Sequence, residues 1–210
     1  MKYDPQKHHR RSIRLKGYDY SQPGAYFITI VTQNRACLFG EVANGEMRLN
    51  EAGRMVHQEW ANLPSRFPNL DLDAFIVMPN HIHGIIIITD VDPVGAGLVG
   101  AGLVPAQNGD GATISGATIS GATISGATIS GATTRVAPTV GDIVGAFKSI
   151  TTVRYTHGVK HCGWLPFRGR LWQRNYYEHI IRDKGSLNRI RDYIVNNPLQ
   201  WERDRENPTV

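Results

Sequence analysis

Residues 78–88 of this 210-residue chain are Met-Pro-Asn-His-Ile-His-Gly-Ile-Ile-Ile-Ile. The apolar run that ends this stretch is typical of a buried β-strand. Because side chains alternate between the two faces of a strand, we expect His81 and His83 to point the same way and Ile82 to point into the opposite layer. Two imidazoles at this spacing can bind a divalent metal ion. The alternative is a pair of hydrogen-bonded polar residues at the mouth of a sheet, and the pair alone names no reaction.

A second motif lies near the C-terminal end, in residues 186–198. Its apolar residues follow the i, i+3, i+7 spacing of a helix that packs one stripe against a core, at Leu187, Ile190 and Ile194. Ser186 is the expected N-cap, and Pro198 is expected to end the helix.

Tyr193 and Asn197 are one helical turn apart on the edge of this stripe. Acting on one phosphate, the amide oxygen can complete a metal site while the phenolic oxygen attacks. Each residue also has an ordinary explanation, since a tyrosine on a helix flank is often a packing residue and an asparagine before proline often ends a helix.

These motifs together resemble the REP-associated tyrosine transposases, single-tyrosine relatives of the transposases of single-strand insertion sequences, within the His-hydrophobic-His nuclease group. The resemblance rests on the histidine strand, on the later Tyr-Ile-x-x-Asn-Pro helix, and on the opening residues 10–21 and 24–29. It implies that His81 and His83 bind a divalent metal, that Tyr193 is the nucleophile, and that Asn197 is the third protein ligand, where more distant relatives carry glutamine. It also implies a substrate of short palindromic repeats folded as single-stranded DNA hairpins.

Composition agrees with a partner that is a polyanion. The chain carries 23 Lys and Arg against 18 Asp and Glu, a formal charge of +5, although many enzymes with other substrates are equally basic. The first 16 residues form a basic arm in which Arg10, Arg11 and Arg14 are candidate phosphate contacts, with a solvated terminus as the alternative. Two cysteines and no leader sequence predict a reduced cytoplasm, and no apolar run is long enough to cross a membrane. The DNA substrate that the resemblance implies would place the protein at the nucleoid.

The remaining patterns predict a ferredoxin-like α+β fold. It consists of an antiparallel sheet with helices on one face, a histidine strand in its middle, and an added C-terminal helix that carries Tyr193. The expected elements are strands over 26–32, 72–78 and 81–89, a hairpin over 39–50, helices over 51–63 and 139–155, and a last strand within 171–182.

Residues 91–137 differ from the rest because they contain exact five-residue repeats, such as Gly111-Ala112-Thr113-Ile114-Ser115. The repeats lack charge and aromatic side chains, so we expect a low-complexity insert in a surface loop of a single domain spanning 17–210. A β-solenoid turn is the alternative. Lengthening a loop costs little closure entropy, so function should tolerate the insert.

Further DNA contacts are predicted beyond the insert. Lys148 and Arg154 lie outside the apolar face formed by residues 143, 147, 150 and 153, and they either contact a DNA backbone or are ordinary solvated residues. Trp172 either stacks on an unpaired base or packs in the sheet. His157, His161 and Cys162 are not expected to form a zinc site, because no second ligand pair lies nearby.

The expected activity is metal-dependent cleavage and rejoining of single-stranded DNA with Mg²⁺ or Mn²⁺, through a 5′-phosphotyrosine. A single-strand binding module without catalysis is the alternative, and a histidine-triad hydrolase is disfavoured because position 85 is isoleucine. Whether the protein is a monomer or a homodimer that exchanges the tyrosine helix stays open at this point.

Overall fold

The computed structural model describes residues 17–90 and 138–209. The basic arm predicted over 1–16, including Arg10, Arg11 and Arg14, and the repeat insert predicted over 91–137 lie outside the described residues. The elements in chain order are β1 (Gly24–Val31), η1 (Gln33–Arg35), β2 (Gly40–Ala43), β3 (Glu46–Leu49), α1 (Glu51–Ala61), α2 (Leu63–Arg66), β4 (Leu70–Val77), β5 (His81–Ile88), α3 (Val140–His161), β6 (Tyr177–Ile181), α4 (Lys184–Val195) and η2 (Pro198–Arg203).

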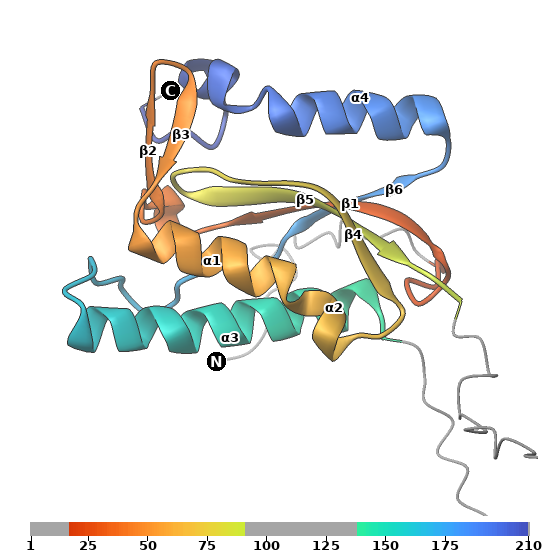
Figure 1. The fold of residues 1–210 in the computed structure, drawn as a ribbon, viewed down its shortest axis with the longest axis horizontal. Coiled ribbons are helices and arrows are strands. Elements are labelled where there is room, and N and C mark those ends of the chain that lie inside the picture. Colours follow the sequence, from red (N-terminus) through yellow and green to blue (C-terminus); the bar gives the residue numbers. More distant parts are fainter. Residues whose placement is uncertain (1–16, 91–137, 210) are drawn as a thin grey trace, which may run out of the picture. The chain divides into compact units, whose positions relative to one another are not determined.

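Four of the strands form one antiparallel sheet in the order β4-β5-β1-β6. Taken without the β2-β3 hairpin, this is the strand order of a ferredoxin-like α+β fold, so the predicted fold class is confirmed. The histidine strand β5 lies in the interior of the sheet, between β4 and β1 (Figure 1). An interior strand has both edges hydrogen-bonded, so the backbone that carries the two histidines is held on both sides.

The two faces of the sheet have different cores. On one face, Tyr26, Ile28 and Ile30 of β1 belong to a large apolar cluster with residues of α1 and α3. On the other face, Phe27 and Ile85 belong to a smaller cluster completed by α4. Figure 1 shows α1 and α3 together on one side of the sheet and α4 on the opposite side. Because side chains alternate along β1 and β5, one face of the sheet packs against the main core and the other packs against α4.

The predicted hairpin over 39–50 is present as β2 and β3. Asn44 and Gly45 form its turn and both have positive φ, 56° and 76°, which is the combination that a tight two-residue hairpin turn needs. A Cβ added to Gly45 would lie 2.7 Å from Cδ2 of Leu199, so the tip of the hairpin packs directly against η2. The hairpin thus supports the segment that follows α4.

Four details of the helices differ from the sequence prediction. α3 extends to His161, and Val153, predicted to face the core, is 68% exposed, because the buried face continues at i+4 through Thr151 and Tyr155. The N-cap of α4 is Asp183 and not Ser186, since the Asp183 carboxylate accepts a hydrogen bond from the Ser186 amide at 2.7 Å. The 51–63 helix ends earlier, at Ala61.

None of the helices in the described ranges is long and apolar enough to cross a membrane.

Candidate metal and nucleophile site

The two histidines of β5 lie side by side on the face of the sheet that α4 covers. They are 0% and 3% exposed, and their Nε2 atoms are 3.1 Å apart. Ile82 between them belongs to the core on the opposite face. The strand therefore presents both imidazoles to one point, as the alternation of side chains predicts.

The ring of His81 is oriented by Asn80. Oδ1 of Asn80 lies 2.8 Å from Nδ1 of His81, while Nδ2 of Asn80 donates to the backbone oxygens of Arg35 and Glu206. Because an amide oxygen can only accept, Nδ1 of His81 must carry the proton. Its Nε2 lone pair is then free and points at the site, which is the tautomer that a metal-binding histidine needs.

His83 is oriented from the neighbouring strand. Thr29 is its cross-strand partner in β1, and the threonine hydroxyl lies 2.8 Å from Nδ1 of His83. The ring of Phe27 stacks on the imidazole at 5.4 Å. The Thr29 hydroxyl and the Phe27 ring thus hold the imidazole of His83 with its Nε2 facing the site.

The C-terminal helix brings Tyr193 to this point. Its apolar stripe packs on the sheet at Leu187, Ile190 and Ile194, and Tyr193 lies on the flank of that stripe. The Tyr193 hydroxyl is 3.2 Å from Nε2 of His83. Tyr193 is 40% exposed, so the residue lies at the boundary between the buried histidines and solvent.

Two oxygen donors complete the cluster. The Asp204 carboxylate lies 3.9 Å from Nε2 of His81, and His81, His83 and Asp204 each offer a ligand atom within 4.8 Å of the others. Asn197 is 1% exposed, and its Nδ2 is 3.5 Å from the Asp204 carboxylate. Sequence reasoning missed Asp204, whose only signal is its place in an acidic and basic run, residues 202–206, that follows the tyrosine helix.

This donor set fits a divalent cation. Asn197 is close enough to His81 and to Tyr193 to influence the pKa of both. Its Oδ1 is nevertheless buried without a hydrogen-bond partner among the described residues. An unpaired buried oxygen is costly, and a bound cation would satisfy it. Two imidazoles with a carboxylate and an amide form a mixed nitrogen and oxygen set of the kind that can bind a divalent cation.

Burial controls the charge state of the site. It lowers the pKa of His81 to about 4 and holds the pKa of His83 well below its ordinary value, so both imidazoles are neutral at pH 7. It also raises the pKa of Tyr193, with the Asp204 charge acting in the same direction. At neutral pH the site therefore holds two neutral ligands and a protonated phenol.

The segment that carries Asp204 is held by its neighbours. Glu206 accepts from Nε of Arg35 at 2.9 Å and from Nε of Arg205 at 2.9 Å. The backbone oxygen of Glu206 accepts from Asn80 at 2.6 Å. Since Asn80 also orients His81, one asparagine ties the histidine strand to the C-terminal segment.

The predicted DNA contacts of the described part of the chain have other partners in this structure. The Lys148 ammonium lies 3.0 to 3.4 Å from the backbone oxygens of residues 173–175, and burial lowers its pKa to about 8. Arg154 forms an ion pair with Glu59. Trp172 is 4% exposed, and its indole nitrogen donates to Thr151 at 2.9 Å. The structure does not bring these three residues to the histidine site, and the buried position of Trp172 agrees with the packing alternative.

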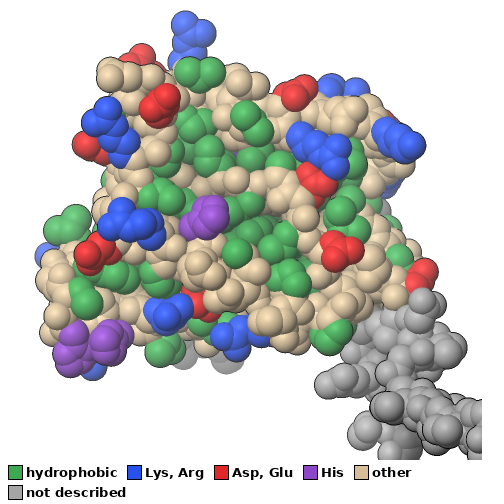
Figure 2. Space-filling model, viewed as in Figure 1, with side chains coloured by type: hydrophobic (Ala, Val, Ile, Leu, Met, Phe, Trp, Pro, Cys, Tyr) green, Lys and Arg blue, Asp and Glu red, His purple; other side chains and the backbone are tan. Residues whose placement is uncertain are grey.

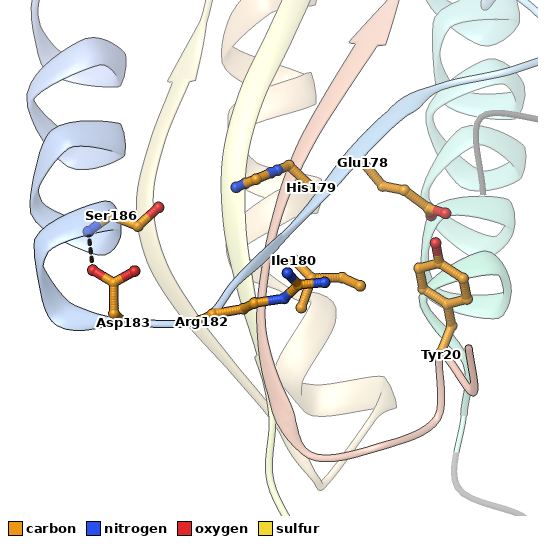
Figure 3. Close-up of a pocket in the computed structure, with 7 residues that line it drawn as sticks. All are labelled: Tyr20, Glu178, His179, Ile180, Arg182, Asp183 and Ser186. Carbon is orange, nitrogen blue, oxygen red and sulfur yellow. Dashed lines mark hydrogen bonds between the residues drawn. The ribbon is translucent and has the colours of Figure 1, made fainter. Parts of the chain in front are cut away.

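A separate cavity of about 360 Å³ lies at the edge strand β6. Figure 3 shows His179, Glu178 and Tyr20 around it, together with the Asp183 cap of α4. None of the residues that line this cavity is His81, His83 or Tyr193. The face of the molecule in Figure 2 carries Lys and Arg side chains dispersed among acidic ones, and they do not gather there into a single basic patch.

The fold and the site together define a ferredoxin-like α+β protein in which two histidines at the start of an interior strand meet a tyrosine of the C-terminal helix. A protein of Haemophilus influenzae (strain Rd), described as uncharacterized, is 39% identical over 207 residues, which cover 97% of this chain and 96% of that protein. The chain belongs to the same protein family as this H. influenzae protein.

No family model matches the chain. Among solved structures, a REP-associated tyrosine transposase bound to a REP hairpin is 16% identical with a TM-score of 0.46, covering 90% of this chain and 74% of that one. A proposed transposase from Deinococcus radiodurans R1 is 17% identical with a TM-score of 0.38, covering 88% and 97%. Both scores are too low for the likeness to decide function.

Proposed function

We propose that the protein is a metal-dependent endonuclease and strand transferase for single-stranded DNA, which acts on hairpin-forming palindromic repeats through a 5′-phosphotyrosine. The observation that carries the proposal is the distance of 3.2 Å between the Tyr193 hydroxyl and Nε2 of His83, beside a buried set of nitrogen and oxygen donors. A nucleophile next to a cation site is an arrangement that promotes phosphodiester transesterification.

Tyr193 supplies the nucleophile. Its hydroxyl oxygen forms a bond to phosphorus, the bond from phosphorus to the 3′ oxygen breaks, and the departing 3′ oxygen takes a proton. The phenol is protonated at neutral pH, since burial raises its pKa further above the ordinary value of about 10, so the site must take up that proton as attack proceeds. Tyr193 is 40% exposed, so part of the residue lies at the surface that a DNA chain would approach.

His81, His83, Asp204 and Asn197 are the residues that would hold the cation. Their neutral imidazoles need not lose a proton before they bind it, because burial lowers the pKa of both. A bound Mg²⁺ or Mn²⁺ would stabilise the charge that develops on the phosphoryl oxygens and would make the phenol easier to deprotonate. Asn80 and Thr29 keep the two rings in place for this task.

The chemistry favours transfer over hydrolysis. The phosphotyrosine bond retains the energy of the broken diester, so a 3′-hydroxyl can reverse the step without ATP. The hairpin substrate is inferred from the resemblance of the histidine and tyrosine motifs to REP-associated tyrosine transposases.

Formation of a covalent adduct tests the proposal. Purified full-length protein is incubated with labelled hairpin-forming single-stranded DNA and Mn²⁺, and denaturing gels are examined for DNA attached to protein. We expect an adduct that chelator prevents and that Tyr193→Phe abolishes. Tyr177→Phe is the matched control. Tyr177 is 45% exposed on β6, the edge strand that pairs with β1, and its loss should leave the adduct intact. An adduct of undiminished yield in Tyr193→Phe would exclude the assignment.

A further inference from the structure

α4 is attached to the sheet by an ion pair as well as by its apolar stripe. Nε of Arg191 donates to one oxygen of Asp73 at 2.8 Å, and Nη2 donates to the other oxygen at 2.5 Å. This is a bidentate pair between α4 and β4, with geometry that fixes direction as well as distance. The arginine also holds the pKa of the Asp73 carboxyl below its ordinary value, so the carboxylate stays charged to a lower pH than a free aspartate does.

A bulge in β4 brings Asp73 to this place. Leu72 pairs with Ile86 and Phe75 pairs with Gly84, so Asp73 and Ala74 together face the single residue Ile85. The extra residue changes the parity of the strand. Ala74 then packs in the small cluster under α4, while Phe75 turns to the opposite face.

The bulge reverses which side chains of β4 face each side of the sheet, and this change affects the packing on both faces. Phe75 stacks on Trp60 in the main core, with ring centroids 4.6 Å apart. On the other face, Asp73 reaches Arg191, and the small side chain of Ala74 lies beneath the helix. A regular strand would place Phe75 against α4 and remove this arrangement.

Arg191 and Tyr193 flank the apolar stripe of α4 on opposite sides. The two positions are about 200° apart around the helix axis. Ile194 is the one fully buried residue of α4, and Leu187 and Ile190 pack beside it partly buried, so a contact outside this short stripe adds a constraint on the rotation of the helix about its own axis. A side chain anchored on one flank therefore determines where the other flank lies.

We propose that the Asp73–Arg191 pair is a positioning device that sets the rotation of α4 and thereby aligns the Tyr193 hydroxyl with the histidines. The inference rests on the proposed function for its catalytic consequence. Arg191 is 43% exposed in its side chain, and a partly exposed pair adds little to stability. Its effect is on alignment, and a displacement of about 1 Å at a reacting atom can cost roughly 100-fold in rate.

The test replaces Tyr193 with 3-fluorotyrosine in the full-length protein and follows its ¹⁹F resonance, which reports the rings of His83 and Phe27 beside it. Arg191→Lys keeps the charge but cannot form the bidentate pair, and Asp73→Asn removes the charge of its partner. We expect both variants to shift the resonance. In the unlabelled protein, kcat for cleavage should fall roughly 10- to 100-fold with KM for DNA little changed. Arg189→Lys, on the exposed side of the same helix, is the matched control and should do neither.

The two readouts separate this inference from the proposed function. If the wild type cleaves no DNA but the resonance shifts in both variants and not in the control, the positioning role stands and the proposed function fails. An unchanged resonance together with wild-type cleavage in Arg191→Lys and Asp73→Asn would overturn the positioning role. A fall in rate equal to that of the Arg189→Lys control would overturn it as well.

Discussion

The hydroxyl of Thr29 lies 2.8 Å from Nδ1 of His83, and the two residues are direct cross-strand partners in β1 and β5. The contact is buried, with Thr29 8% exposed. The pairing of these two strands therefore has two effects at this point: it joins β1 to β5, and it orients an imidazole. A group that hydrogen-bonds to the ring nitrogen that does not bind the metal commonly influences the affinity of the histidine for the metal.

Removing the Thr29 hydroxyl should weaken metal binding while the fold persists. We expect Thr29→Val, which keeps the shape of the side chain, to lower Mn²⁺ affinity roughly 10- to 100-fold in titration calorimetry. Thr29→Ser retains the hydroxyl and should bind nearly as the wild type does. Equal affinity in the valine variant would show that the hydroxyl does not support the site.

Asp204 should contribute to cation binding. Its carboxylate lies 3.9 Å from Nε2 of His81, and Asp204→Asn removes the only acidic oxygen of the candidate donor set. We expect Mn²⁺ affinity to fall at least roughly tenfold. Glu202→Gln is the matched control, because Glu202 is exposed in the same C-terminal segment. A similar loss in both variants would indicate a general charge effect and not a ligand.

The stability of the metal-free protein should depend on pH through the buried histidines. Burial lowers the pKa of His81 to about 4, whereas a histidine in an unfolded chain has a pKa of about 6.5. Below pH 6.5 the unfolded chain binds protons that the folded chain excludes, so the free energy of unfolding decreases as the pH falls toward 4. The slope is at most about 1.4 kcal/mol per pH unit for each histidine.

Denaturant titrations in the presence of chelator, from pH 7.5 to 4.5, measure this dependence. Other groups also titrate in the range, so the comparison is with the double variant His81→Gln, His83→Gln. The double variant should show a shallower slope. If its slope equals that of the wild type, the two imidazoles are not held neutral in the folded protein.

Most of the correct predictions from the sequence depend on two patterns: the alternation of side chains along a strand and the spacing of side chains along a helix. Alternation in 78–88 placed both histidines on one face of a central strand, and the four-residue spacing placed Tyr193 and Asn197 together. Both patterns are local, because they depend on the backbone geometry of a single element. The fold class followed from the order of these elements along the chain, which is that of a ferredoxin-like domain.

Contacts between distant segments were beyond those patterns. The ion pair of Arg154 with Glu59 and that of Arg191 with Asp73 join residues far apart in the chain, and no periodicity marks either partner. Asp204 follows a short 3₁₀ turn, where side-chain direction does not obey a simple period. The bulge at Asp73 changes which side chains face the core, and only the pairing register reveals it.

Gly84 should be intolerant of any side chain, because it lies between His83 and Ile85 against an aromatic stack. A Cβ at this position would be 2.4 Å from Cζ2 of Trp60 and 3.0 Å from Phe75. Trp60 is 3% exposed and stacked on Phe75, so it cannot move without disturbing the core. We expect Gly84→Ala to lower the free energy of unfolding by roughly 1–3 kcal/mol, measured by urea denaturation.

Gly145 provides the matched control for this substitution. It is exposed within α3, and a Cβ there would meet nothing within 4 Å. Gly145→Ala should therefore raise the free energy of unfolding by up to about 1 kcal/mol, since alanine favours a helix interior over glycine. Opposite signs for the two variants are the expected result. A Gly84→Ala protein as stable as the wild type would mean that Trp60 does not pack against the histidine strand in the way the structure describes.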